Sequence, residues 1–265
     1  MSVPVALTIA GSDSSGGAGI EADLKTFAAL GVYGACAITA LTAQNSKGVS
    51  AVHDAPAEIV AAQLDAVFAD LDVASVKIGM LANAAIAQTV EAGLVRHRAG
   101  NVVLDPVMAA STGAGLLRGD ATTALRGLIP HVRVLTPNLL EAAALLDGPL
   151  ARNEAEMRDQ AEKLLALGAG AVLIKGGHAD GAESVDLLVE GETCLRLAAP
   201  RIATQNTHGT GCTFAAAIAA SLAKGLPLDD AARQAKAYVS AAIAAADLLG
   251  VAASNGPLHH FYKWW

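Results

Sequence analysis

The stretch 207-THGTGCTFAAAIAASLA-223 joins a glycine-containing turn to a run of small apolar residues. Its glycines, Gly209 and Gly211, let the backbone turn tightly, and the alanine-rich run predicts a helix over 213–223. The first amides of a helix have no partner inside the helix and lie at the positive end of its dipole. The turn at 209–212 is therefore suited to bind an anion such as a phosphoryl group.

Thr210 and Cys212 complete this turn, and Cys212 adds a reactive side chain. A thiol at a helix start is expected to lose its proton more readily than it does in water. The alternative is an ordinary turn before an alanine-rich helix, and these residues alone do not decide between the two interpretations.

The composition indicates a globular protein with one or two domains. The chain has 265 residues, of which 53% are hydrophobic, so it can bury a sizeable core. The formal net charge is −7 and no basic block occurs, which disfavours nucleic acid as a main partner. The three cysteines, Cys36, Cys194 and Cys212, form no Cys-x-x-Cys pair, so we expect neither a disulfide framework nor a zinc site. Neither a basic signal-peptide start nor a long uncharged apolar run is present, so we expect a cytoplasmic protein with no membrane partner.

Short β-rich runs alternate with helical runs along the chain. Strands are predicted at 3–9, 35–42, 49–53, 75–78, 101–105, 132–136, 171–175, 185–189 and 194–197, and helices at 21–30, 56–68, 84–98, 121–128, 154–167, 213–223 and 229–249. This alternation predicts an α/β fold with a mostly parallel central sheet and helices on both faces. No linker or repeat interrupts it, so we expect a single domain over residues 1–265.

In an open parallel sheet, ligands bind beyond the carboxyl ends of the strands. The residues expected in the loops there are mostly polar or glycine: Gly11, Ser12, Gln44, Asn45, Gly79, Met80, Asp105, Pro106, Asn138, Lys175, Gly176 and Gly177. Loops after strands are often polar anyway, so this clustering is an indication and not an assignment.

A glycine loop, 10-AGSDSSGGAG-19, follows the first predicted strand. Gly17, Gly19 and Ala22 fit the pattern G-x-G-x-x-A, which raises a dinucleotide site as an alternative. The first of these glycines lies well past the strand end, and the next strand carries no acid for a ribose. We therefore favour a wall of a small-molecule pocket over an NAD site or a plain surface turn.

Asp105 ends a hydrophobic strand, where a carboxylate could hold Mg²⁺ or simply cap the loop. Glu141 follows Asn138 by three residues, so both lie on one helical face, either at a metal or in an ordinary helix start. Lys175 is placed between a strand and two glycines, where a phosphate can approach. Lys236 lies within a predicted helix and, from the residues alone, belongs to a solvated face.

We assign no chemical role to the histidines and aromatic residues near these motifs. His208 and His178 flank the glycine turns, and we assign neither a catalytic role. The tail 259-HHFYKWW-265 holds four of the nine aromatic residues, which predicts that it packs on the body or on a partner subunit.

As a set, the motifs of this chain resemble those of the bacterial hydroxymethylpyrimidine/phosphomethylpyrimidine kinases, which belong to the ribokinase-like superfamily. The resemblance runs from about residue 5 to the last residue and rests on AGSDSSGGAGIEAD, TAQN, VKIGML, VLDPVM, TPNLLEA, IKGGH, THGTGCT and HFYKWW. It implies a three-layer ribokinase-like sandwich and a homodimer. It also implies a kinase of thiamine biosynthesis that phosphorylates 4-amino-5-hydroxymethyl-2-methylpyrimidine, and then its monophosphate, with ATP and Mg²⁺.

The resemblance also implies roles for individual residues. Asp23 and Gln44 would bind the pyrimidine edge, and the pocket walls would be Gly11, Ala18, Met80 and Val107. Gly209, Thr210, Gly211 and Cys212 would form the anion hole, and the phosphate contacts would be Lys175, Lys236 and Thr207. Asp105 and Glu141 would hold the magnesium.

The resemblance leaves some questions open. Cys212 stands where the similar sugar kinases carry aspartate, and residues 109–115 differ from the flap of many relatives. Two alternatives remain: a pyridoxal kinase, or a non-catalytic pyrimidine sensor on the same fold. Joint retention of Asp105, Glu141, Lys175 and Cys212 argues against the sensor.

Overall fold

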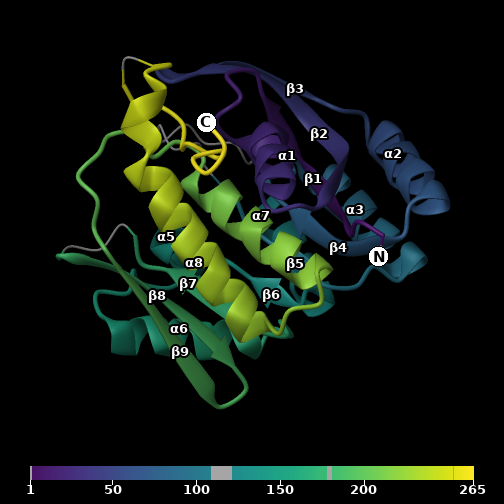
Figure 1. The fold of residues 1–265 in the computed structure, drawn as a ribbon. Coiled ribbons are helices and arrows are strands. Elements are labelled where there is room, and N and C mark those ends of the chain that lie inside the picture. The colour runs from purple at the N-terminus through teal and green to yellow at the C-terminus, as the bar shows by residue number, and fades with distance from the viewer. Residues whose placement is uncertain (1, 109–120, 178–180, 253) are drawn as a thin grey trace.

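The computed structural model describes residues 2–108, 121–177, 181–252 and 254–265. Within these residues, one sheet of nine strands has the order β3-β2-β1-β4-β5-β6-β7-β8-β9 (Figure 1). The strands are β1 Val5–Asp13, β2 Tyr33–Asn45, β3 Gly48–Asp54, β4 Val73–Ile78, β5 Val102–Leu104, β6 Val134–Leu135, β7 Val172–Lys175, β8 Glu183–Glu190 and β9 Thr193–Pro200. Within the sheet, the neighbours in the series β2-β1-β4-β5-β6-β7 pair in parallel. At the two edges, β3 pairs antiparallel with β2, and β8 pairs antiparallel with both β7 and β9.

Helices cover both faces of the sheet. They are α1 Gly19–Ala29, α2 Ala57–Asp70, α3 Ala84–His97, α4 Ala121–Leu128, α5 Leu139–Leu146, α6 Glu154–Leu165, α7 Thr210–Ala223 and α8 Leu228–Ala244. One core lies between the sheet and α1, α7 and α8, and a second lies between the sheet and α2 to α6. Successive strand residues alternate between the two cores, as Ala6 and Leu7 do. The predicted α/β fold with three layers is confirmed.

The strand order fixes the place of the site. β1 lies between β2 and β4, so the chain moves away from β1 in opposite directions along the sheet. In open α/β sheets such a reversal opens a crevice beyond the carboxyl ends of the neighbouring strands. The loop after β1 and the N-terminus of α7 are expected to meet at that end.

Several element boundaries differ from those predicted. Gly11 and Gln44 lie inside strands and not in loops, because β1 continues to pair with β2 after a bulge and Gln44 pairs with Val49 of β3. Helix α7 begins at Thr210 and not at Thr213, because Gly209 already acts as its N-cap. Helix α8 ends at Ala244, and a 3₁₀ turn, Ala246–Leu249, follows it.

The C-terminal tail packs on the body only in part. His259 and His260 are buried, whereas Trp264 and Trp265 are 69% and 73% exposed. Trp265 contacts the rings of His259 and Phe261. The helices among the described residues include none of the length and apolar character that crossing a bilayer requires.

Candidate active site

The N-terminus of α7 has the backbone geometry expected of an anion site. Gly209, its N-cap, has φ 83°, a left-handed conformation that glycine adopts without strain. A Cβ at this position would also overlap the carbonyl oxygen of Gly17, so the turn packs backbone against backbone on the glycine loop. Gly209 has no side chain to cap the helix, and the amide of Thr210 already donates to the carbonyl of Thr207, so the amides of Gly211 and Cys212 are the ones that face a ligand.

Lys175 and Asp105 come from two strand ends and meet at this turn. Lys175 Nζ lies 2.6 Å from Asp105 Oδ1 and 3.9 Å from Glu141 Oε2. A Cβ on Gly211 would lie 3.3 Å from Lys175 Nζ and 3.6 Å from Asp105 Oδ2. The structure therefore brings together the predicted anion turn, the predicted phosphate lysine and both predicted metal carboxylates.

Glu141 takes part in the helix start that the sequence offered as one alternative, and it also lies beside Asp105, where the other alternative, a metal role, stays a prediction. Asn138 and Glu141 form a capping box at the start of α5, in which each side chain accepts from the other's backbone amide. Glu141 is also buried near Asp105: burial raises its pKa to about 7, Lys175 opposes that rise and Asp105 adds to it. A buried pair of carboxylates with one lysine between them carries surplus negative charge, which a cation would balance.

Two carboxylates beside the anion turn match the ligands that Mg²⁺ uses with substrate phosphates. Among the described residues, no group of three or more His, Cys, Asp and Glu side chains is arranged to hold a metal ion. Mg²⁺ is bound by one or two carboxylates together with substrate phosphates and water, and does not need a full protein cage. Asp105 and Glu141 meet that requirement beside the anion turn.

The thiol of Cys212 does not behave as predicted from its place at a helix start. Burial raises its pKa to about 11, and the carboxylates of Asp23 and Asp105 contribute to the rise. Lys77 and the backbone amide of Gly19 lower the pKa but do not compensate. The expectation of an easily ionised thiol is wrong, because burial outweighs the helix terminus.

The residues predicted to bind the pyrimidine surround the ends of β1, β2 and β4. A Cβ on Gly11 would lie 3.0 Å from Met80 Sδ, so these two predicted wall residues are neighbours. Ala18 is the N-cap of α1 and lies against Gly209. Gln44 is half-buried at the end of β2. Val107 packs against the core two residues after Asp105.

Asp23 lies deeper than its predicted role requires. Its side chain is fully buried and forms an ion pair with Lys77, with 2.8 Å between Nζ and Oδ2. Its other oxygen, Oδ1, has no hydrogen-bond partner among the described residues. A contact between Asp23 and a substrate stays a prediction.

Lys236 and Thr207 serve the framework around the site. Lys236 Nζ donates to Asp186 Oδ2 at 2.7 Å, and Asp186 accepts from the amide of Gly176, next to Lys175. The carbonyl of Thr207 accepts from the hydroxyl of Thr210 at 2.6 Å, which closes the anion turn. The predicted phosphate contacts of Lys236 and Thr207 stay predictions.

Sequence reasoning missed Lys77, Asp13 and His208. Lysine is rarely buried without a partner, so Lys77 inside the apolar strand VKI was a detectable signal. His208 Nε2 lies 2.8 Å from Asp13 Oδ2, and both side chains are buried. No local pattern announces that pair. The predicted flap at 109–115 and His178 lie outside the described residues.

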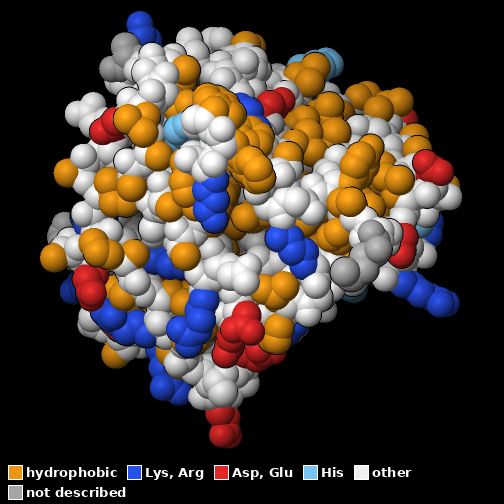
Figure 2. Space-filling model, in the orientation of Figure 1, with side chains coloured by type: hydrophobic (Ala, Val, Ile, Leu, Met, Phe, Trp, Pro, Cys, Tyr) orange, Lys and Arg blue, Asp and Glu red, His pale blue; other side chains and the backbone are white. Residues whose placement is uncertain are grey.

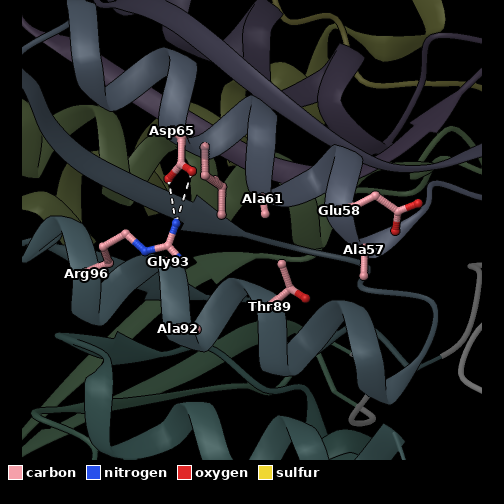
Figure 3. A pocket seen from close by; sticks show the side chains of 9 residues that line it. Ala57, Glu58, Ala61, Asp65, Thr89, Ala92, Gly93 and Arg96 are labelled. Carbon is pink, nitrogen blue, oxygen red and sulfur yellow. Dashed lines mark hydrogen bonds and ion pairs between the residues drawn. The ribbon is translucent and has the colours of Figure 1, made fainter.

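A hollow of about 210 Å³ lies elsewhere, between α2 and α3 (Figure 3). It is lined by Ala57, Glu58, Ala61, Leu64, Asp65, Thr89, Ala92, Gly93 and Arg96. Arg96 is directed at the carboxylate of Asp65, as the dashed lines show (Figure 3). The hollow holds none of the predicted site residues, and we assign it no function.

The sheet topology and an uncapped helix N-terminus facing a lysine and two carboxylates define a small-molecule kinase of the ribokinase-like fold. The model of the family described as phosphomethylpyrimidine kinase matches residues 13–259. The chain belongs to this family and is a phosphotransferase.

Individual relatives agree with this assignment. The chain is 57% identical over 262 residues to the hydroxymethylpyrimidine/phosphomethylpyrimidine kinase of Rhizobium meliloti, covering 98% of each protein. A crystal structure of phosphomethylpyrimidine kinase from Clostridium difficile 630 is 41% identical, with a TM-score of 0.81 over 91% of this chain and 99% of that one. The structure of pyridoxal kinase from Staphylococcus aureus in complex with AMP-PCP and pyridoxal is 34% identical, with a TM-score of 0.90 over 100% and 96%.

Proposed function

We propose that this chain uses ATP to phosphorylate 4-amino-5-hydroxymethyl-2-methylpyrimidine and then its monophosphate, in thiamine biosynthesis. The observation that carries the proposal is the meeting of Lys175, Asp105 and the amides of α7 at one point. The high identity to a kinase named for both pyrimidine substrates supports it. We infer that residues 1–265 act as one kinase domain.

In the first step, the hydroxymethyl oxygen attacks the γ-phosphorus of ATP, a new P–O bond forms, and the bond to the β-phosphate oxygen breaks to release ADP. The hydroxyl proton is lost in this step, whereas the monophosphate of the second step is already an anion. Phosphoryl transfer has a loose transition state, so positioning and charge neutralisation dominate over base strength. The amides of Gly211 and Cys212 and the ammonium of Lys175 would neutralise the transferring group.

Asp105 and Glu141 would hold magnesium on the phosphate side of the site. Bound there, the ion would neutralise charge on the phosphate oxygens of ATP. Lys175 now balances these carboxylates, so it would be free to turn toward the phosphoryl group when a cation takes its place.

The neutral thiol of Cys212 suits a site that accepts two different nucleophiles. A carboxylate at this position would repel the anionic monophosphate, whereas a thiol with its pKa raised to about 11 stays uncharged near neutral pH. We infer that this helps one site serve both steps.

Coupled ADP detection tests the proposal directly. The purified chain with ATP and Mg²⁺ should release one ADP with the hydroxymethyl pyrimidine and a second with its monophosphate. Gln44→Leu should raise KM for the pyrimidine through an unpaired polar group, which costs about 1–3 kcal/mol, while KM for ATP stays unchanged. Absence of ADP release with either pyrimidine would refute the proposal.

Pyridoxal is a second candidate substrate. The pyridoxal kinase of Staphylococcus aureus has the same fold over the full length of this chain, although its identity is lower than that of the pyrimidine kinase relative. The same ADP assay with pyridoxal decides this point: a kcat/KM equal to that for the pyrimidine would favour a dual-specificity enzyme.

We propose that the chain works as a homodimer in the cytoplasm. Val3, Tyr33 and Leu41 are more than half exposed, although they are large apolar residues. Figure 2 shows hydrophobic side chains gathered over the region of α1 and β2. Light scattering after size exclusion tests the dimer, and a monomer at micromolar concentration would refute it.

A further inference from the structure

The glycine loop 10–19 fixes the backbone of Gln44 through hydrogen bonds with Ser14. The hydroxyl of Ser14 donates to the backbone carbonyl of Gln44 and accepts from its backbone amide, each at 2.9 Å. The side chain extends from this fixed point. As the atoms are placed, its Oε1 lies 3.1 Å from Thr42 Oγ1 and its Nε2 lies 3.4 Å from His208 Nε2. Two neighbours therefore flank the amide on its lateral sides.

The protonation of His208 follows from that of Asp13. The Asp13 carboxyl accepts from the amides of Ser15, Gly17 and Ala18 and from the hydroxyl of Ser15. Burial raises its pKa, but hydrogen bonds from His208 and Ser15 outweigh burial and hold that pKa well below its usual value. A carboxylate can only accept, so His208 Nε2, at 2.8 Å, carries a proton and donates it.

These roles orient the amide of Gln44. The oxygen and nitrogen of an amide have the same shape, so their partners decide which is which. His208 Nε2 carries its proton toward Asp13 and has no lone pair to accept one, so an amide N–H beside it is disfavoured. The amide oxygen therefore belongs on its side, which exchanges the two amide ends relative to their placement. Thr42 has one hydroxyl proton, which goes to the carbonyl of Ser12 at 2.9 Å, so its oxygen accepts and the amide nitrogen belongs on its side.

We propose that His208 and Thr42 fix the orientation of the Gln44 amide and thereby select a heterocycle that presents a donor and an acceptor in one order. The amide keeps one lone pair and one N–H on its outer edge. A 4-aminopyrimidine offers a matching pair, an amino N–H beside a ring nitrogen. This inference rests on the proposed function, in which Gln44 contacts the pyrimidine.

If the amide of Gln44 were reversed, the substrate could not restore both hydrogen bonds by binding in a flipped orientation. Its hydroxymethyl group lies next to the carbon that carries the amino group, and it has to face the anion turn. A 4-oxo counterpart, with a carbonyl in place of the amino group and N–H in place of the ring nitrogen, presents the opposite order. The ratio of kcat/KM for the 4-amino and 4-oxo compounds therefore reports the orientation of Gln44.

The closing experiment measures this ratio in wild type, His208→Leu, Thr42→Val and His208→Gln. We expect wild type to prefer the 4-amino compound, and each of His208→Leu and Thr42→Val to lower the ratio about tenfold, as loss of one or two oriented hydrogen bonds implies. The change should appear in KM, with kcat for the 4-amino compound little altered. His208→Gln places an amide N–H near the position of Nε2 and should restore much of the ratio.

A matched control is His259→Leu, at another buried histidine, whose ring meets that of Trp265 at a tilt of 51° and 4.9 Å between centroids. It should leave the ratio unchanged. Thr42→Val is nearly isosteric, so it keeps the test valid if His208→Leu fails to fold. A ratio within twofold of wild type in Thr42→Val, and in His208→Leu where that variant folds, would overturn the inference.

The outcome separates this inference from the proposed function. If wild type releases no ADP with the 4-amino compound, the proposed function fails. If wild type is active and Gln44→Leu raises KM for the pyrimidine, but the ratio does not respond to His208 or Thr42, only the present inference fails.

Discussion

Lys77 and Asp23 form an ion pair that no solvent reaches. Lys77 Nζ lies 2.8 Å from Asp23 Oδ2, and both side chains are 0% exposed. Thr8 donates a second hydrogen bond to the same carboxylate oxygen at 2.6 Å. Burial lowers the pKa of Lys77. The nearby charges, of which Asp23 is the largest, and the hydrogen bond to Asp23 together outweigh burial and raise that pKa, so the ammonium stays charged. The pair ties β4 to α1 under the N-terminus of α7.

Replacing Lys77 by methionine should destabilise the protein strongly. The change leaves the Asp23 carboxylate buried without its counter-charge, which typically costs about 3–5 kcal/mol. The double variant Lys77→Met with Asp23→Asn should recover part of that loss, because it removes the uncompensated charge. The free energy of unfolding in urea, measured near neutral pH, checks both expectations.

The matched control is Lys163→Met. Lys163 pairs with Asp159 at 2.7 Å on the exposed face of α6, and each side chain is 61% exposed. Exposed pairs contribute little, about 0.3–0.5 kcal/mol for this spacing. If Lys77→Met lowers the free energy of unfolding no more than Lys163→Met does, the buried pair does not contribute to stability as proposed.

Asp105→Asn should reduce magnesium-dependent turnover while leaving pyrimidine binding largely intact. Asp105 lies beside Lys175 and the anion turn, on the phosphate side of the site. Removing one of two carboxylates weakens binding of Mg²⁺ more than binding of an uncharged ring. Calorimetry with the pyrimidine alone, next to turnover measured over a magnesium series, checks this. A tenfold loss of pyrimidine affinity with unchanged turnover would show that the assignment is wrong.

Local patterns predicted the parts of the site that each depend on one segment. The glycine turn before an alanine-rich run announced the N-terminus of α7, and hydrophobic runs ending in a polar residue announced Asp105 and Lys175 at strand ends. Both signals follow from the backbone periods of helices and strands, so short stretches of sequence contain them.

Properties that depend on distant segments could not be predicted in this way. Asp13 and His208 are 195 residues apart in the chain, and only the packing of the glycine loop on α7 brings them together. The pKa of Cys212 was predicted in the wrong direction because the helix start is local, whereas burial by α1 and the nearby carboxylates is not. The continuation of β1 to Asp13 likewise depends on its neighbour β2.

Cys212→Ala should slow the first phosphorylation far more than the second. The thiol form that predominates near neutral pH cannot take up a proton, so only the thiolate form of Cys212 can accept the hydroxyl proton. If it does, removal of Cys212 costs on the order of 10²-fold with the alcohol and much less with the monophosphate, which has no such proton to lose. Because the pKa of the thiol is raised to about 11, the wild-type rate with the alcohol should still be rising with pH between 7 and 10. Separate rates for each substrate at saturating Mg-ATP, over that pH range, check both points.

Alkylation provides an independent check on the same thiol. Cys194 is exposed and Cys212 is not, so iodoacetamide should modify Cys194 first, and modification of Cys212 should accelerate steeply as pH rises toward 10. Intact-mass and peptide-mass measurements resolve the two sites. Equal losses in both phosphorylation steps for Cys212→Ala would exclude the proton-acceptor role and leave the sulfur as a packing group.

His260 should make the protein sensitive to acid in a defined window. Burial lowers its pKa to about 4, with smaller contributions from Lys25 and His259, and its Nε2 lies 3.0 Å from the hydroxyl of Thr213 in the first turn of α7. The unfolded chain takes up a proton on this residue below about pH 6.5, and the folded chain does so only near pH 4. Titration of His260 therefore does not reduce the free energy of unfolding above pH 6.5. As the pH drops from 6.5 toward 4, this residue alone lowers the free energy of unfolding by up to about 3 kcal/mol.

His260→Gln should remove that window, because glutamine can still bond to Thr213 but does not titrate. The free energy of unfolding of wild type minus that of the variant should fall between pH 6.5 and 4 and be level above pH 7. His53→Gln, at an exposed position on β3, is the control and should leave the pH profile unchanged. If the free energies of unfolding of wild type and His260→Gln depend on pH in the same way, the loss of stability in acid comes from protonation of carboxylates and not from His260. His260 would then keep an ordinary pKa in the folded protein.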